Sequence, residues 1–256
     1  MCTVTLIPLN NNNFVLTSNR DEAPNRLPIP PDFYSEDNVT MLYPKDRLAG
    51  GTWIGVSENK RLICLLNGGF GFHERKAEYR QSRGVVVKDL LALKSIQDFK
   101  AYNFFDIEPF TLVITDWNSK LAFYELVWDG KRAHFNQLEL NSHIWSSSTL
   151  YSKEKRLKRK KWFAKFEQNN ALSADSVLLF HKTAGKGNDD FGVIMDRGYV
   201  KTTSITQVIK NDKDILLRYE SFQENSVSLE SFKSSEVINE YSILTIYKSL
   251  LKLLLS

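Results

Sequence analysis

Short apolar segments separated by turn residues open the chain. Thr3–Leu9 and Phe14–Ser18 are rich in apolar residues, and the first of them also in β-branched ones. The asparagines at 10–13 between them suit a turn, because Asn tolerates left-handed backbone. The pattern therefore predicts a β-hairpin at the N-terminus. Both of its faces carry apolar residues near the turn, which is typical of a sheet covered on both sides.

The register of this hairpin decides which polar residue faces the start of the chain. A turn centred between residues 11 and 12 pairs residues whose numbers sum to 23, so Cys2 lies opposite Asp21. Directly opposed Cβ atoms in antiparallel strands are about 4.5–5.5 Å apart. A slip of one residue brings Arg20 or Glu22 to Cys2 instead. Strict alternation also sends Arg20 and Asp21 to opposite faces of the strand.

The rest of the chain alternates between strands and a few blocks of helix. The proline-rich segment 23–43 predicts a loop, and 50–56 predicts a turn that leads into a strand. Periodicity and turn signals predict strands at 61–66, 111–117, 121–128, 133–138 and 143–146, a hairpin of 192–195 with 199–208, and a last strand at 215–219. Helices are predicted at 85–93 behind Ser82, at 152–167 and at 173–182, with a short helix capped by Ser95.

Strands outnumber helices, and the helices come in blocks rather than after every strand. This order favours the α+β class, with two antiparallel sheets packed face to face and helices outside them, a four-layer αββα sandwich. The length suits a single domain over residues 1–256. Within it, 240–256 is a candidate C-terminal helical extension, because the apolar residues of 241–255 recur at spacings of three and four.

Composition narrows the class of protein. The chain has 42% hydrophobic and 25% charged residues and a net charge of +4, which are ordinary globular values. Two cysteines, Cys2 and Cys64, provide no disulfide framework. The N-terminus lacks the basic and apolar regions of a secretory signal, and the apolar C-terminus is too short and too charged to cross a bilayer. We therefore expect a cytoplasmic protein with no stable membrane insertion.

Cys2 is the most informative residue for chemistry. Removal of Met1 makes Cys2 the N-terminal residue, which then carries both a thiol and a free α-amine. The pKa of an α-amine is about 8 and that of a thiol about 8.5, so the amine can act as general base for its own nucleophile. The competing interpretation is a small buried side chain without a catalytic role.

Two polar clusters can complete such a site. The run Asn19–Glu22 lies where the hairpin returns to Cys2, and there a buried Arg favours a thiolate and a buried Asp orients an amine. Asn67 follows an apolar strand, and an Asn amide can donate to an oxyanion. Gly68 and Gly69 behind it let a substrate approach the backbone. A solvated charge run and a plain Asn-Gly turn remain the alternatives.

Other signals are weaker. The basic segment 153–165 predicts a helix whose Leu157, Trp162 and Phe166 form an uneven apolar stripe, and we interpret it as a solvated face rather than a nucleic-acid or lipid site. The histidines lack metal-ligand spacing, and no phosphate-binding loop is present. We expect no metal, no nucleic acid and a small-molecule substrate or ligand, and the sequence leaves a homo-oligomer open.

Several motifs in order resemble one family. The start MC, SNRDE at Ser18–Glu22, AGGTWIGV at Ala49–Val56, LLNGG at Leu65–Gly69 and TTSITQV at Thr202–Val208 resemble the NRDE family, also called the transport and Golgi organisation family. That family is similar to N-terminal-nucleophile hydrolases of the penicillin V acylase and bile salt hydrolase type. These enzymes have the αββα fold and cleave non-peptide amide bonds with an N-terminal Cys.

The resemblance implies roles for individual residues. The catalytic set it implies is Cys2 as nucleophile, Arg20 and Asp21 as the activating pair, and Asn67 as oxyanion donor. The implied substrate-binding set is Asn19, Glu22, Trp53, Gly68, Ser147 and Ser148. The chain departs from the acylases in having Arg and Asp adjacent and in offering serines where a second oxyanion Asn is expected. Arg197 and Arg218 are the candidates for a late catalytic Arg.

Two functions follow from the resemblance. The first is an N-terminal-cysteine amidohydrolase that cleaves a small non-peptide amide or acyl substrate, a hydrolase of carbon–nitrogen bonds other than peptide bonds, with no cofactor. The alternative is a non-catalytic carrier or chaperone that uses the same pocket for haem or an acyl lipid, since family members are linked to haem trafficking and lipid metabolism.

Overall fold

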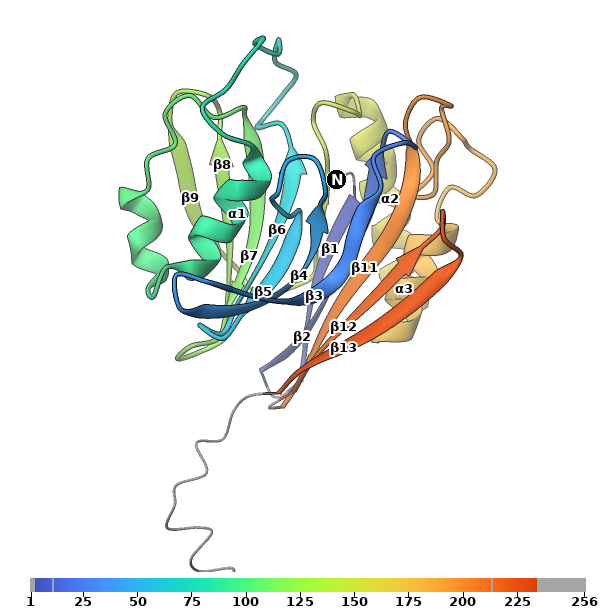
Figure 1. The fold of residues 1–256 in the computed structure, drawn as a ribbon. Helices are drawn as coiled ribbons and strands as arrows, with labels where there is room; N and C mark the ends of the chain where they lie inside the picture. Colours follow the sequence, from blue (N-terminus) through green and yellow to red (C-terminus); the bar gives the residue numbers. More distant parts are fainter. Residues whose placement is uncertain (1–2, 11, 213, 234–256) are drawn as a thin grey trace, which may run out of the picture.

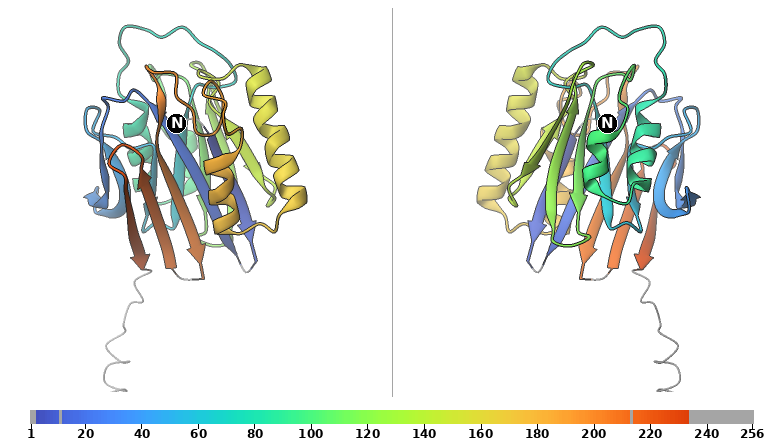
Figure 2. Two further views of the ribbon diagram at one scale, coloured as in Figure 1. Left: turned by 90° about the vertical axis from the view of Figure 1, so that its right-hand side faces the viewer. Right: turned by 90° about the vertical axis from the view of Figure 1, so that its left-hand side faces the viewer.

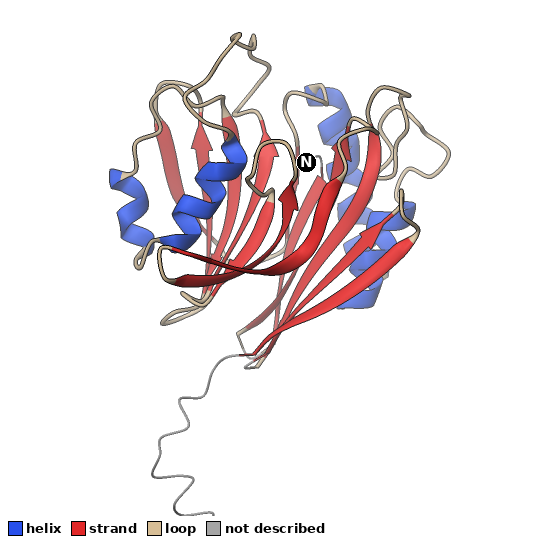
Figure 3. Cartoon of the chain, viewed as in Figure 1, coloured by secondary structure: helices blue, strands red, loops and turns tan. Residues whose placement is uncertain are grey.

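Two antiparallel sheets packed face to face form the centre of the molecule, as seen in the computed structural model, which describes residues 3–10, 12–212 and 214–233 (Figure 1). The six-stranded sheet has the order β10-β1-β2-β11-β12-β13, and the seven-stranded sheet runs β3-β4-β5-β6-β7-β8-β9. Helices lie on the outer faces of both sheets (Figures 2 and 3). The α+β class and the αββα layering predicted from the sequence are confirmed.

The elements have the following bounds. The strands are β1 Thr3–Leu9, β2 Asn13–Glu22, β3 Pro28–Glu36, β4 Val39–Asp46, β5 Ile54–Ser57, β6 Arg61–Asn67, β7 Phe110–Asp116, β8 Ala122–Trp128, β9 Ala133–Leu138, β10 His143–Ser146, β11 Lys201–Asn211, β12 Asp214–Ser221 and β13 Ser226–Lys233. The helices are α1 Arg83–Ala92, α2 Lys153–Asn169, α3 Ala174–Thr183 and the short 3₁₀ helix η1 Ile96–Ala101. The predicted helices are confirmed, with Ser82, Ser95, Ser152 and Ser173 as their N-caps.

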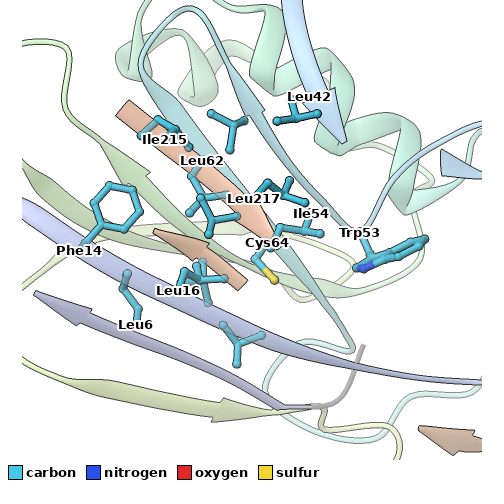
Figure 4. Close-up of a cluster of buried hydrophobic side chains, with 14 of the residues drawn as sticks. Leu6, Phe14, Leu16, Leu42, Trp53, Ile54, Leu62, Cys64, Ile215 and Leu217 are labelled. Atoms are coloured by element: carbon cyan, nitrogen blue, oxygen red, sulfur yellow. The ribbon is translucent and has the colours of Figure 1, made fainter. Parts of the chain in front are cut away.

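Three apolar clusters separate the layers. The cluster between the two sheets joins aliphatic side chains of both, and its members include Leu6, Leu16, Leu62, Cys64 and Leu217 (Figure 4). A second cluster packs α1 against the outer face of the seven-stranded sheet, and a third packs α2 and α3 against the six-stranded sheet. Because both faces of each sheet are covered, the central strands are apolar on both sides, as the sequence indicated.

The N-terminal hairpin forms in a different register from the predicted one. Thr3 pairs with Asn19 and Ile7 with Val15, so paired residue numbers sum to 22 rather than 23. Asn12 takes a positive φ of 59°, which closes the loop one residue earlier than a symmetric four-residue turn. Cys2 lies outside the described residues, so the predicted pairing of Cys2 with Asp21 is not seen directly.

Three other predictions were wrong. The proline-rich segment forms the β3–β4 hairpin rather than a loop, because β3 is an edge strand whose register shifts between Ile29 and Asp32, where prolines are tolerated. Residues 192–195 form no strand, since their backbone bonds Ala184, Asn19 and Arg159 instead. A further strand, β13, follows the predicted last strand. The candidate helical extension at 240–256 lies outside the described residues.

No helix among the described residues is long and apolar enough to cross a membrane.

Candidate functional site

A cavity of about 280 Å³ opens where β2 and β6 end and β5 begins, beside the start of α1. The loop from β6 to α1 rises above this end of the seven-stranded sheet (Figure 1). Eighteen residues line the cavity, and seven of them are charged: Arg20, Glu22, Arg26, Asp46, Arg75, Arg83 and Glu108. The predicted residues Trp53 and Asn67 line it as well. The structure therefore brings four predicted site residues together around one cavity: Arg20, Glu22, Trp53 and Asn67.

The motif AGGTW frames one wall of the cavity through close backbone contact. A Cβ added at Gly51 would lie 2.3 Å from the carbonyl carbon of Gly84 in α1, so only glycine fits there. The backbone N–H of Thr52 donates to the Gly84 carbonyl at 3.1 Å. The Thr52 hydroxyl contacts the carbonyls of Pro44 and Ile54 at 2.6 and 2.8 Å. These contacts lock the loop before β5 to the first turn of α1.

Strand β2 divides the NRDE residues between two faces, as strict alternation predicted. Arg20 and Glu22 point to the cavity, whereas Asn19 and Asp21 bond residues of the helical side of the six-stranded sheet. All of them but Glu22 are fully buried. Four adjacent residues of one motif thus belong to two separate environments.

Arg20 is a buried cation on the cavity side. Its guanidinium lies 4.5 Å from the centre of the Trp53 ring and donates to the Thr203 hydroxyl at 3.2 Å. Thr203 reaches it because β11 bulges there, between the pairs Thr202–Asp21 and Ser204–Arg20. Burial lowers the pKa of Arg20, while Glu22 and Asp46, 3.7 and 3.6 Å from Nη2, oppose that shift.

Asp21 is anchored on the opposite side of the sheet. Its Oδ2 accepts from the Tyr151 hydroxyl and its Oδ1 from the Thr202 hydroxyl, both at 2.6 Å. The guanidinium of Arg159 in α2 lies 3.7 Å from the centre of the Tyr151 ring and donates to the Thr3 hydroxyl at 2.6 Å. Asp21 therefore belongs to a buried polar network that surrounds the start of β1.

Asn19 lies in the same helical layer, next to the buried His181 of α3. Its amide N–H groups donate to the carbonyls of His181 and Val193 at 3.0 and 2.9 Å, and its carbonyl oxygen contacts His181 Nδ1. His181 Nε2 bonds the Thr5 hydroxyl at 2.8 Å. Burial, with the nearby charge of Arg159, lowers the pKa of His181 to about 3, so its imidazole is neutral. The Asn19 side chain therefore does not reach the cavity.

Asn67 ends β6 at the cavity, and Ser147 and Ser148 hold the backbone there and in the loop that follows. The Ser147 hydroxyl donates to the Asn67 carbonyl at 2.9 Å, and the Ser148 hydroxyl donates to the Gly69 carbonyl at 2.8 Å. Gly68 has a positive φ of 86°, and a Cβ there would lie 2.2 Å from Ser148 Oγ. Both serines and Gly68 thus fix the backbone around Asn67, and none of the three lines this cavity.

A second group of charges lines the far wall, and the sequence did not point to it. Glu108 lies 3.3 Å from Nη2 of Arg83, 3.9 Å from Nε of Arg75 and 3.3 Å from Nε2 of His73. Arg83 also donates to the carbonyl of Pro109, and burial lowers its pKa although Glu108 opposes the shift. Within the described ranges, no group of three or more His, Cys, Asp or Glu residues is arranged to hold a metal ion.

Residues 1–221 match the family model described as Transport and Golgi organisation 2. The chain belongs to this family. No curated protein matches the chain.

The fold of this Transport and Golgi organisation 2 family member is shared with solved hydrolases. A variant of conjugated bile acid hydrolase from Clostridium perfringens matches with a TM-score of 0.50 and 10% identity, over 91% of this chain and 97% of that one. The Caenorhabditis elegans N-acylethanolamine-hydrolyzing acid amidase ortholog matches with a TM-score of 0.55 and 9% identity, over 80% and 92%. The predicted likeness to N-terminal-nucleophile hydrolases is confirmed for the fold.

Arg159 is the residue of this family member that sequence reasoning missed most clearly. The segment 153–165 was interpreted as a solvated face, yet Arg159 is fully buried and donates to the carbonyls of Phe191 and Gly192. The predicted stripe began at Leu157, which is 47% exposed. The signal that would have found Arg159 is its spacing of four from Phe163, which places both on one helix face.

The two predicted late arginines occupy other positions. Arg197 donates to the carbonyls of Leu150 and Asp190 and lies 5.2 Å from the Tyr151 ring. Arg218 pairs with Glu220 along β12. Neither lines the cavity.

Proposed function

We propose that this protein is an N-terminal-cysteine amidohydrolase that cleaves a small non-peptide amide or acyl substrate in the cavity beside Arg20 and Asn67. The observation that carries the proposal is the convergence of a buried cation, Arg20, and a carboxamide, Asn67, on a cavity lined by β2, which pairs with the first described strand. Thr3 opens that strand and is paired with Asn19 on one side and Ser146 on the other. The hydrolase fold and the family membership support the same chemistry.

The proposed reaction begins once Met1 is removed. The α-amine of Cys2 takes the thiol proton, and the thiolate attacks the substrate carbonyl to form a tetrahedral oxyanion. The side-chain N–H of Asn67, with backbone N–H groups, stabilises that oxyanion. The α-ammonium returns the proton to the departing amine as the C–N bond breaks, and water then hydrolyses the thioester to release the acid.

Neighbouring residues have supporting roles in this proposal. Arg20 favours the thiolate by its positive charge, since its guanidinium is held by Trp53 and Thr203 on the cavity side. Asp21, fixed by Tyr151 and Thr202, orients the N-terminal residue from the other face. The seven charged residues of the cavity suit a polar small molecule better than the haem or acyl lipid of the carrier function, which requires apolar walls.

Two measurements test the proposal. Intact-mass analysis of the native protein should show that Met1 is absent, and retention of Met1 would exclude the mechanism. Iodoacetamide at neutral pH should label Cys2 much faster than Cys64, because Cys64 is buried and its pKa is raised to about 12. Labelling of Cys2 should slow by about tenfold in Arg20→Gln. Equal, slow labelling of both thiols would contradict an activated nucleophile.

Amide hydrolysis itself is the decisive test. Cys2→Ala should abolish hydrolysis of any amide substrate, and Cys64→Ser should leave the rate unchanged.

A further inference from the structure

The two charged walls of the cavity differ in their balance of charge. On the β2 side, Arg20 and Arg26 face two carboxylates, Glu22 and Asp46, and Arg26 Nε lies 2.8 Å from Asp46 Oδ2. On the α1 side, Arg75 and Arg83 share the single carboxylate of Glu108. The first wall is neutral, and the second has one positive charge in excess.

The excess charge sits on groups that can receive a ligand. Arg83 is anchored by the Pro109 carbonyl, and its side chain is only 17% exposed, so its guanidinium is poorly solvated and fixed in place. Arg75 is 78% exposed, and its Nε is 3.9 Å from Glu108, beyond hydrogen-bond length. A long, exposed cation held this weakly can turn toward an anion in the cavity at little cost.

The volume and lining of the cavity limit the length and the chemical character of the anion that can bind. A volume of about 280 Å³ lies just below the range of small-molecule sites, roughly 300–1,000 Å³. The apolar side chains in the lining are few, and Trp53 already covers Arg20 with one ring face. A long acyl chain would therefore meet ion pairs instead of an apolar tunnel, whereas a short anionic molecule would meet a matching charge.

We propose that the cavity selects a short amide that carries a carboxylate, and that Arg83 and Arg75 bind this carboxylate while Asn67 faces the scissile carbonyl. This inference rests on the proposed hydrolase function and names its substrate class. Arginine is suited to this role because its planar guanidinium binds a carboxylate through two parallel hydrogen bonds.

A binding experiment tests the carboxylate site without requiring catalysis. Succinate, glutarate and adipate are titrated into the full-length protein by calorimetry, with 1,5-pentanediol as an uncharged probe. At least one dicarboxylate should bind about tenfold or more tightly than the diol, because a hydrogen bond to a charged group contributes that much. Arg83→Gln should weaken that binding by about tenfold. Arg132→Gln, an exposed arginine on the β8–β9 turn, should leave it unchanged.

Arg75→Gln is a second variant that tests the same site if Arg83→Gln does not fold. Because Arg75 is exposed and weakly paired, its substitution leaves the fold intact, and it should still weaken dicarboxylate binding several-fold. Dicarboxylates that bind no better than the diol, or binding that neither variant weakens, would overturn the inference.

A hydrolysis experiment separates the substrate class from the proposed function. Glutaryl and pentanoyl amides of 7-amino-4-methylcoumarin differ in a terminal carboxylate on the acyl side, and N-pentanoylglycine carries one on the amine side. A carboxylate-bearing amide should have a kcat/KM at least tenfold above the neutral one, and Arg75→Gln should remove most of that difference. Equal Cys2-dependent hydrolysis of neutral and anionic amides would overturn the inference and leave the hydrolase standing. Dicarboxylate binding that Arg83→Gln weakens, without hydrolysis of any of these amides, would overturn the proposed hydrolase and leave only the carboxylate-binding role of Arg83 and Arg75.

Discussion

The two faces of strand β2 differ in what their polar residues are bound to. On the helical face, Asn19 and Asp21 are bound by fixed buried partners, namely backbone carbonyls, hydroxyls and the neutral imidazole of His181. On the cavity face, Arg20 and Glu22 take part in ion pairs with N–O distances of 3.6–3.7 Å, and both line the cavity. The first face is a closed network, and the second is a set of longer ion pairs that borders the cavity.

This difference shows that a continuous motif need not be a continuous site. A strand alternates its side chains, so residues 19 and 21 support the start of β1 from behind while residues 20 and 22 line the cavity. We therefore expect substitutions on the helical face to lower stability most, and substitution of the partly exposed Glu22 on the cavity face to change binding with little effect on stability.

The largest effect on stability is expected for Asp21→Ala. The change removes the acceptor of the Tyr151 and Thr202 hydroxyls inside the protein, where neither can turn to bulk water. Leaving buried donors without that acceptor should lower the free energy of unfolding by about 2–4 kcal/mol. Urea denaturation at pH 7 measures the loss.

Asp21→Asn is the matched variant, because it keeps the shape and one acceptor oxygen. It should lose less stability than Asp21→Ala. Unchanged midpoints for both variants would show that the helical face is not the closed network described above.

A smaller, pH-dependent effect on the free energy of unfolding is expected from His181. Its pKa is about 3 in the folded protein and about 6.5 when unfolded, so the unfolded state binds a proton that the folded state excludes. The stability that depends on the neutral imidazole is fully present above pH 6.5 and is lost as the pH falls toward 3. Between pH 7 and pH 5 this contributes a loss of about 2 kcal/mol.

The measurement compares urea denaturation of the wild type and His181→Gln at the two pH values. The variant cannot titrate at this position, so it should lose about 2 kcal/mol less than the wild type on acidification. His143→Gln, a partly buried residue of β10 outside this network, should follow the wild type. Identical pH dependence in the wild type and His181→Gln would mean that the imidazole is not held neutral by this network.

Local patterns predicted most elements of the fold but not their exact register. Alternating apolar residues and Ser caps identified β6–β10 and the helices because these signals are local. The register of β1 on β2 depends on one asparagine in the left-handed region, and β3 depends on its place at a sheet edge. Sequence pattern records neither the backbone angle of Asn12 nor the neighbours of a strand.

For the candidate site, the motif residues were easier to find than their partners. Arg20 and Asn67 stood out because each belongs to a motif at the end of a predicted strand. Glu108 and Arg83 lie outside these motifs in sequence. Packing of α1 against the loop before β5 brings Arg83 to the cavity, and the pairing of β7 with β6, Phe110 opposite Asn67, brings Glu108 there. Arg159 was missed because it is one of many cations in its helix, and only its spacing of four from Phe163 distinguishes it.

The smallest effect on stability is expected for Glu22→Gln, next to Asp21 in the chain. The Glu22 side chain is 25% exposed, and its pairs with Arg20 and Arg26 are 3.7 and 3.6 Å long, so they contribute little to stability. Urea denaturation should show a change below about 1 kcal/mol. The substitution nevertheless removes one of the two carboxylates that balance Arg20 and Arg26, so the β2 wall also becomes positive and anionic ligands should bind more tightly. A loss of stability as large as that of Asp21→Ala would mean that both faces of β2 are closed networks, and the distinction between them would fail.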